Sequence, residues 1–245
     1  MIKLLVSIKY DFEVEAAVRG GADIIDIKDP SRGSLGLPDL RVLVEAMSKI
    51  KKLNITGLEA SMAGGDVDRY EPYLEYVSYV AASLGLNYFK VGLAMRSIDD
   101  AKTVAQRVSS VLGSFSNTRF VLVGYADFER AGSIEPLKII DVAREVDADG
   151  VMIDTRVKDG KTTFDFLSRS YLKTFVKKAH ESSLIAALAG SLRRTHIIDA
   201  IELEFDVVGF RGAVCSGGRN GVISEDLVRE MKNIIKDYYE GSTRT

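Results

Sequence analysis

The sequence has few residues of the kinds that build disulfides, metal centres or histidine-based catalysis. Its 245 residues include one cysteine and two histidines. A single cysteine excludes an internal disulfide framework and a cysteine-based zinc site. Two histidines leave little for a histidine-rich metal site or a histidine-centred triad. We therefore expect a protein without a metal and without a cofactor.

Long hydrophobic runs and a strong excess of one charge are also missing. No stretch reaches the ~18 apolar residues that a membrane-spanning helix needs, and the apolar run at the N-terminus, about six residues long, is too short for a signal peptide. The chain has 33 Lys and Arg against 35 Asp and Glu, a net charge of −2, which argues against a large contact with a phosphate backbone. We expect a cytoplasmic protein, a homo-oligomer, with no nucleic-acid and no membrane partner.

The apolar content, 46% of the residues, is sufficient for one sizeable core. Short apolar runs alternate along the chain with longer amphipathic segments, and runs that are apolar on both faces are typical of buried parallel strands. We predict strands at 3–8, 23–28, 55–60, 88–93, 120–126, 150–154, 184–189 and 207–211. We predict helices at 12–19, 40–50, 73–84, 97–112, 136–146, 171–182, 195–204 and 225–239.

Eight strand–helix units without a linker predict one (β/α)8 barrel domain over residues 1–245. The competing fold is an open doubly wound sheet, which normally carries a glycine-rich fingerprint after its first strand. The segment after the first predicted strand is Lys9-Tyr10-Asp11 and contains no glycine. The absence of that fingerprint favours the barrel.

Charged residues occupy strand positions that should face the barrel interior. Alternate strand residues point inward, and the carboxyl ends of the strands form the usual active-site mouth. With Ile25 facing the helices, Asp26 and Lys28 face inward, and the same alternation turns Lys90 and Asp154 inward from the fourth and sixth strands. A buried ion-pair network that only stabilises the barrel is the structural alternative. Four such residues on alternate strands favour catalysis.

Two inward lysines suggest amine chemistry. A lysine near other cations in a partly dry pocket has a lowered pKa and can attack a carbonyl. We predict Lys28 as the nucleophile and Lys90 as the proton acceptor, with Asp26 and Asp154 orienting groups or relaying protons. Lys158 follows in the loop after the sixth strand, where it is either part of the site or a solvated loop residue.

A phosphate site is predicted after the seventh and eighth strands, where barrels often bind phosphate through backbone amides. The candidates are Gly190, Ser191, Arg211, Gly212, Gly217 and Gly218, with Arg219 adding charge. Gly64-Gly65 is predicted to be a turn. A catalytic role for Cys215 is disfavoured because no histidine is near it in sequence, and Tyr125 and Asp127 are weaker candidates for the mouth.

Several motifs together resemble the (5-formylfuran-3-yl)methyl phosphate synthase family, the furan-forming enzymes of methanofuran biosynthesis. The resemblance covers nearly the whole chain and departs from the family pattern at Glu59–Asp66. The motifs are GGADIIDIKDP at 20–30 with GSLG at 33–36, KVGL at 90–93, GYAD at 124–127, MIDT at 152–155 with KDGKT at 158–162, FDFL at 164–167, ALAGSLR at 187–193 and RGA at 211–213.

The resemblance implies a barrel lyase that condenses two glyceraldehyde 3-phosphate molecules, with loss of phosphate and water. It assigns the Schiff base to Lys28, proton acceptance to Lys90, and assisting roles to Asp26, Asp154 and Lys158. Two other functions fit the residues: a Schiff-base phosphosugar aldolase, which stops after carbon–carbon bond formation, and a phosphometabolite-binding barrel without catalysis.

Overall fold

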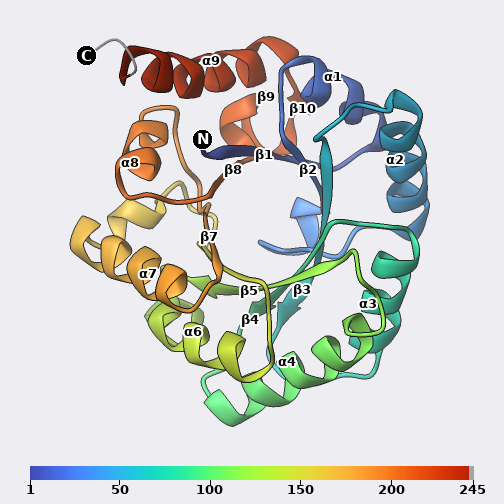
Figure 1. The fold of residues 1–245 in the computed structure, drawn as a ribbon, viewed down its shortest axis with the longest axis vertical. Helices are drawn as coiled ribbons and strands as arrows, with labels where there is room; N and C mark the ends of the chain where they lie inside the picture. The colour runs from blue at the N-terminus through green and yellow to red at the C-terminus, as the bar shows by residue number, and fades with distance from the viewer. Residues whose placement is uncertain (243–245) are drawn as a thin grey trace.

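The chain closes eight parallel strands into a barrel surrounded by helices (Figure 1). The computed structural model describes residues 1–242. The strands are β1 (Lys3–Ile8), β2 (Ile24–Ile27), β3 (Glu59–Val67), β4 (Tyr88–Leu93), β5 (Arg119–Tyr125), β6 (Gly150–Asp154), β7 (Ile185–Leu188) and β8 (Val207–Phe210). β1 pairs with both β2 and β8, which closes the barrel. The predicted (β/α)8 fold is therefore confirmed.

A helix follows each strand and covers the outside of the barrel. These helices are α1 (Val14–Arg19), α2 (Leu40–Leu53), α3 (Tyr73–Ser83), α4 (Ile98–Leu112), α6 (Pro136–Glu145), α7 (Arg169–Glu181), α8 (His196–Glu202) and α9 (Glu225–Ser242). A short helix α5 (Phe128–Ala131) lies in the loop after β5, and a small hairpin of β9 (Cys215–Ser216) and β10 (Val222–Ile223) follows β8. Within residues 1–242 no helix combines the length and apolarity needed to cross a membrane.

Local signals account for several helix starts. The Ser97 hydroxyl accepts a hydrogen bond from the Asp100 amide at 3.1 Å, which caps α4. Pro136 occupies the first turn of α6, where its missing N–H leaves no bond unmade. The Ser224 hydroxyl accepts from the Leu227 amide at 3.4 Å at the start of α9. The sequence therefore locates these helix starts to within a residue.

The third strand was predicted incorrectly. The structure places β3 at Glu59–Val67, whereas Ile55 lies outside any strand and is 47% exposed. Gly64 and Gly65, predicted to form a turn, lie inside β3, where the pairing with β4 shifts register between Ala63 and Asp66. Gly65 has φ +122, and a Cβ at Gly64 would lie 2.5 Å from the Phe89 ring. Glycine is required here because the strand is irregular and closely packed.

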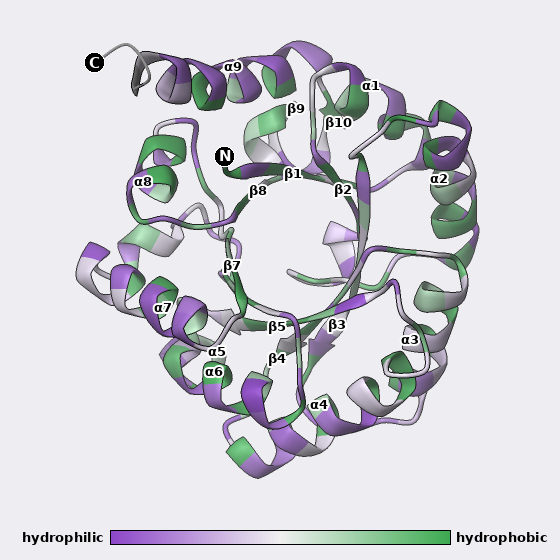
Figure 2. Cartoon of the chain, viewed as in Figure 1, coloured by the Kyte–Doolittle hydropathy of each residue, from purple (hydrophilic) through white to green (hydrophobic). Residues whose placement is uncertain are grey.

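The barrel has two apolar layers, which settle the direction of each strand residue. One layer lies between the sheet and the helices and contains Ile25, Ile27 and Phe89. The other fills the barrel interior and contains Ile24 and Tyr88. Figure 2 shows the matching pattern on the helices, whose apolar stretches alternate with hydrophilic ones. Side chains alternate along a strand, so Asp26 points into the barrel interior as Ile24 does. This is the direction that the sequence predicted.

Candidate functional site at the barrel mouth

A cavity of about 320 Å³ opens at the carboxyl ends of the strands. Residues from β1, β2, β6, β7 and β8 and from the loops that follow them line it. Among these residues are Ser7, Asp26, Lys28, Asp154, Lys158, Gly160, Gly190, Ser191, Arg193, Arg211, Gly212 and Arg219. The cavity lies where barrel enzymes hold their active sites.

Lys28 comes directly after β2 and is only 6% exposed. Within residues 1–242 its ammonium has no hydrogen-bond acceptor and no carboxylate within 4.0 Å. Burial lowers the pKa of Lys28 to about 8, and the charges of Lys90 and Lys158 act in the same direction. The carboxylates of Asp154 and Asp26 oppose that shift without cancelling it. About a tenth of Lys28 is therefore a free amine at pH 7, far more than for an ordinary lysine.

Asp26 pairs with Lys90 across the barrel interior. The two charged groups are 2.8 Å apart and both side chains are buried. The Ser7 hydroxyl donates a second contact to Asp26 at 2.8 Å. Burial raises the pKa of Asp26, but Lys90 and Lys28 outweigh it, so the net pKa lies below the usual range. Asp26 lines the cavity and Lys90 does not, so Asp26 stands between Lys90 and the cavity.

Asp154 and Lys158 form a second pair on the opposite wall. Lys158 Nζ lies 2.6 Å from Asp154 and donates to the Thr155 hydroxyl at 3.0 Å. Burial disfavours the Asp154 carboxylate, but Lys158 and Lys28, with the Thr155 amide, bring its pKa down to about 2. Lys158 therefore belongs to the mouth and is not a freely solvated loop residue.

The segment after β7 presents unused backbone donors to the cavity. In the described part of the chain, the amides of Gly190, Ser191 and Leu192 have no hydrogen-bond acceptor. Gly190 has φ +101, and a Cβ there would lie 2.1 Å from the Thr163 hydroxyl. Only glycine fits this position, and Gly190, Ser191 and Leu192 all line the cavity. Such a cluster of amides is suited to an anion.

The predicted phosphate residues after β8 do not all face the cavity. Gly212 lines it, whereas Gly217 and Gly218 lie in the exposed turn between β9 and β10 and are not among the lining residues. Both glycines have positive φ, so the conformation of the turn is enough to explain why glycine occurs at these two positions. The structure gives these two residues no contact with the cavity.

Arg211 lies at the cavity, but its guanidinium already has protein partners. It forms a buried ion pair with Glu13 at 2.8 Å and donates to the carbonyls of Ser7, Gly221 and Arg219. Glu13 also accepts from the amides of Lys9, Tyr10 and Ile223. The pair ties the loops after β1 and β8 together, and the sequence contained no signal for it because the two residues are far apart along the chain.

Another carboxylate missed by sequence reasoning is Asp66 in β3. It accepts from the Tyr125 hydroxyl at 2.5 Å and from the amides of Ser34 and Leu35. These contacts hold the loop after β2 against the barrel, where Leu35 is fully buried. In the sequence, only the glycines around Leu35 indicated that this loop packs closely. Tyr125 thus contributes to this loop contact.

Two weaker candidates remain, Asp127 and Cys215. Asp127 accepts from the amides of Arg156 and Val157 and so shapes the loop after β6. Burial raises the pKa of the Cys215 thiol to about 11. A thiol with that pKa is protonated at neutral pH and is a poor nucleophile. Nucleophilic chemistry at the mouth therefore rests on the amines.

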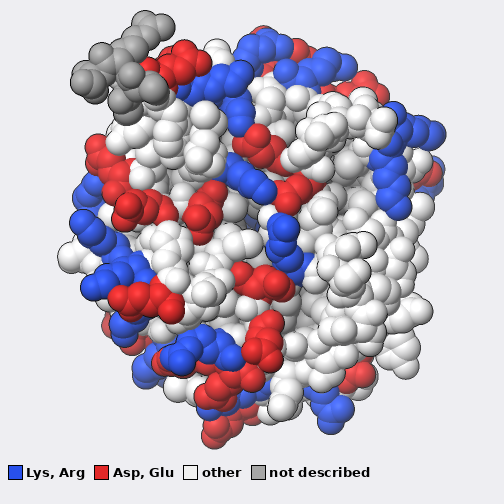
Figure 3. All heavy atoms as spheres, viewed as in Figure 1, with Lys and Arg blue, Asp and Glu red and all other residues white. Residues whose placement is uncertain are grey.

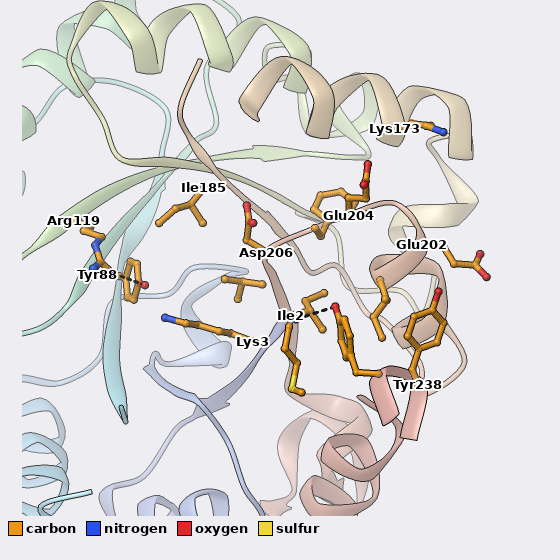
Figure 4. A pocket seen from close by; sticks show the side chains of 15 residues that line it. Ile2, Lys3, Tyr88, Arg119, Lys173, Ile185, Glu202, Glu204, Asp206 and Tyr238 are labelled. Carbon is orange, nitrogen blue, oxygen red and sulfur yellow. Dashed lines mark hydrogen bonds between the residues drawn. The ribbon is translucent and has the colours of Figure 1, made fainter. Parts of the chain in front are cut away.

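A larger cavity, about 990 Å³, lies at the opposite end of the barrel (Figure 4). The first residues of several strands line it, among them Lys3, Tyr88 and Arg119. The charges of Lys3 and Arg119 are already paired. The Glu59 carboxylate lies 2.5 Å from the Lys3 ammonium and 3.1 Å from the Arg119 guanidinium. This end of a barrel usually serves stability.

Figure 3 shows charges of both signs over the visible face, with few over α3.

Comparison with known proteins identifies the family of the chain. The family described as 4-HFC-P synthase matches residues 4–232. The (5-formylfuran-3-yl)methyl phosphate synthase of Methanocaldococcus jannaschii is 39% identical over 244 residues, covering 96% of this chain and all of that protein. The protein of the same name from Methanothermobacter thermautotrophicus is 40% identical over 239 residues, covering 96% and 99%.

Among solved structures, phosphoribosyl anthranilate isomerase from Thermus thermophilus has a similar fold, with a TM-score of 0.62 at 13% identity, covering 97% of this chain and 100% of that one. At this identity the likeness concerns the fold alone. The match to the family and to its relatives extends over nearly the whole chain. The chain therefore belongs to the (5-formylfuran-3-yl)methyl phosphate synthase family.

Proposed function

We propose that this protein is a cytoplasmic lyase that condenses two glyceraldehyde 3-phosphate molecules into (5-formylfuran-3-yl)methyl phosphate for methanofuran biosynthesis. The observation that carries the proposal is Lys28, a buried amine with a pKa of about 8 that lines the same cavity as residues with unused backbone donors. The names of the relatives supply the product. Atom balance requires release of one inorganic phosphate and two water molecules per furan formed.

In the first step, neutral Lys28 attacks the aldehyde carbon of one triose phosphate, and loss of water gives an iminium ion. The iminium withdraws electrons and acidifies the neighbouring C–H bond. Asp26 is placed to take that proton because it lines the cavity, and Lys90 at 2.8 Å can share it. Lys90, having first given its own proton to the water that leaves in iminium formation, then serves as the final proton acceptor through Asp26. The product of this step is an enamine.

In the next steps, the enamine carbon forms the new carbon–carbon bond to C3 of the second triose phosphate, whose phosphate leaves with the electrons of its C–O bond, so the second aldehyde is kept as the formyl group. Asp154 and Lys158 lie on the facing wall, where Lys158 can protonate the oxygen that becomes negative. Loss of water, and release of Lys28 by hydrolysis, leave the aromatic furan. Aromaticity makes the last steps favourable.

The amides of Gly190, Ser191 and Leu192, with the loop at Gly212, hold a substrate phosphate in this proposal. Backbone donors bind an anion without placing a further cation beside Lys28.

Incubation with glyceraldehyde 3-phosphate tests the proposal. We expect a furan chromophore and free phosphate in equal amounts, and covalent labelling of Lys28 on addition of borohydride. A Schiff-base aldolase would be labelled but would release no phosphate. A binding protein without catalysis would show neither result. Lys28→Arg, which keeps the charge but provides no neutral amine near pH 7, should lose turnover and labelling.

A further inference from the structure

Three cations in the mouth each pair with a carboxylate, and a fourth has no such partner among the described residues. Lys90 pairs with Asp26, Lys158 with Asp154, and Arg211 with Glu13. Lys28 needs no counter-ion when it is a free amine. The remaining cation with a partly buried side chain on the cavity wall is Arg219.

Arg219 uses only part of its guanidinium to hold its position. Its Nη2 donates to the carbonyls of Pro30 at 3.2 Å and Gly33 at 3.0 Å, both in the loop after β2. Among residues 1–242, no carboxylate lies within 4.0 Å of this guanidinium, and its Nε and Nη1 have no acceptor. A partly buried cation without a counter-ion is costly in the empty protein, and an anionic ligand would offset that cost.

The guanidinium and the amides lie on different sides of the mouth. The backbone of Arg219 passes over Gly212, but its side chain reaches past β1 to the loop that follows β2. The free amides of Gly190 and Ser191 belong to the segment after β7. Lys28, at the end of β2, is on the same side as the guanidinium. A ligand with two phosphates could therefore contact both places.

We propose that Arg219 forms a second phosphate subsite, separate from the amides after β7, which binds the phosphate of the second triose phosphate. The inference rests on the proposed function, since only a condensation of two phosphorylated trioses needs two anion sites in one cavity. Arg193 also lines the cavity, but its side chain is exposed and its charge is solvated. It provides a matched control of the same residue type.

Calorimetric titration with inorganic phosphate tests the subsite without reference to turnover. We expect two phosphates per wild-type chain, one per chain for Arg219→Gln, and two for Arg193→Gln. Arg219→Lys, which keeps the charge, should restore the second phosphate at a lower affinity. One phosphate per wild-type chain, or wild-type titration by Arg219→Gln, would overturn the subsite. Thermal melting confirms that each variant is folded.

Kinetics with glyceraldehyde 3-phosphate give the second measurement. Arg219→Gln should keep borohydride labelling of Lys28, because the first triose binds at the amides, while the KM for furan formation rises at least 10-fold. Loss of labelling together with turnover would show a single shared site and contradict the proposal. If wild-type protein forms no furan, the proposed function fails, whereas the phosphate titration still decides whether the second subsite exists.

Discussion

Asp26 pairs with Lys90 at 2.8 Å and leaves Lys28, two residues further along the same chain segment, without an anionic partner. Both lysines are buried in the barrel, but among the described residues only Lys90 has a carboxylate within 4.0 Å. Burial without a paired carboxylate lowers the pKa of Lys28 to about 8. The arrangement therefore assigns different chemical tasks to two residues of the same type.

The pH dependence of Schiff-base formation should follow Lys28. Its pKa is lowered from 10.5 to about 8, so the free amine increases as pH rises through 8. The initial rate of borohydride labelling should therefore rise with pH and level off above about 8. Asp154, with a pKa of about 2, stays ionised throughout and adds no transition in this range. A midpoint near 10.5 would contradict the assignment.

Lys158→Met provides a related measurement. The variant removes a cation that lowers the pKa of Lys28 and frees the Asp154 carboxylate that raises it. The midpoint of labelling should move to higher pH. An unchanged midpoint would show that Lys158 has no electrostatic effect on Lys28.

Removal of the Lys28 charge should stabilise the fold. A folded-state pKa below the unfolded one means that the unfolded chain binds more protons between about pH 8 and 10.5, so this group's contribution to stability rises with pH in that window. Below pH 8 the full penalty applies, roughly 3 kcal/mol at 1.36 kcal/mol per pKa unit. Lys28→Met should raise the free energy of unfolding at pH 7 by about 1–3 kcal/mol.

Denaturant unfolding of Lys28→Met and wild type at pH 7 and at pH 10.5 checks this prediction. The difference between the two proteins should shrink at the higher pH, where Lys28 is neutral in the folded protein and already half neutral in the unfolded chain. Lower stability of Lys28→Met at pH 7 would show that the charge is not destabilising.

Replacement of Arg211 should affect stability as well as substrate binding. Arg211→Ala leaves the Glu13 carboxylate buried without its cation, and breaking one partner of a buried pair costs about 3–5 kcal/mol. Glu13→Gln should destabilise the protein to a similar extent. Denaturant unfolding measures both effects. If Arg211→Ala raises KM strongly while stability is unchanged, the guanidinium binds phosphate directly, as its position after β8 first indicated.

The contact between Asp66 and the loop after β2 should hold that loop closed. Asp66→Asn replaces one acceptor oxygen with a donor, so one of the bonds to Ser34, Leu35 or Tyr125 is lost, at about 1–3 kcal/mol for a buried group left unpaired. Amide hydrogen exchange at Ser34 and Leu35 should become faster. Tyr125→Phe keeps both amide bonds and should change exchange much less. Equal exchange rates in the wild type and Asp66→Asn would show that Asp66 does not hold this loop closed.

Gly190→Ala should abolish phosphate binding at the amides after β7. The new Cβ would lie 2.1 Å from the Thr163 hydroxyl, and φ +101 is strained for any residue with a side chain. Gly57→Ala is the matched control, since Gly57 also has positive φ but nothing within 4 Å of its Cβ position. Phosphate titration should show loss of one site in the first variant only. Normal binding by Gly190→Ala would place the phosphate elsewhere.

Local patterns in the sequence were sufficient for the fold and for the inward direction of the charged residues. Strand bounds at 3–8, 88–93 and 150–154 match residue for residue, because these runs are apolar on both faces and end at clear breaks. Where glycine interrupts a strand, as at Gly64, the same reasoning predicts a turn. A bulge depends on the neighbouring strand and has no local signal.

The partners of the charged groups were decided by tertiary structure alone. Glu13 and Arg211 are separated by almost the whole chain, and Asp66 meets Ser34 and Tyr125 from three different strand ends. Alternation along a strand tells which way a side chain points but carries no information about which opposite charge it meets. That choice depends on strand register and loop conformation around the closed barrel, and it separates Lys28, which is left unpaired, from Lys90, which is not.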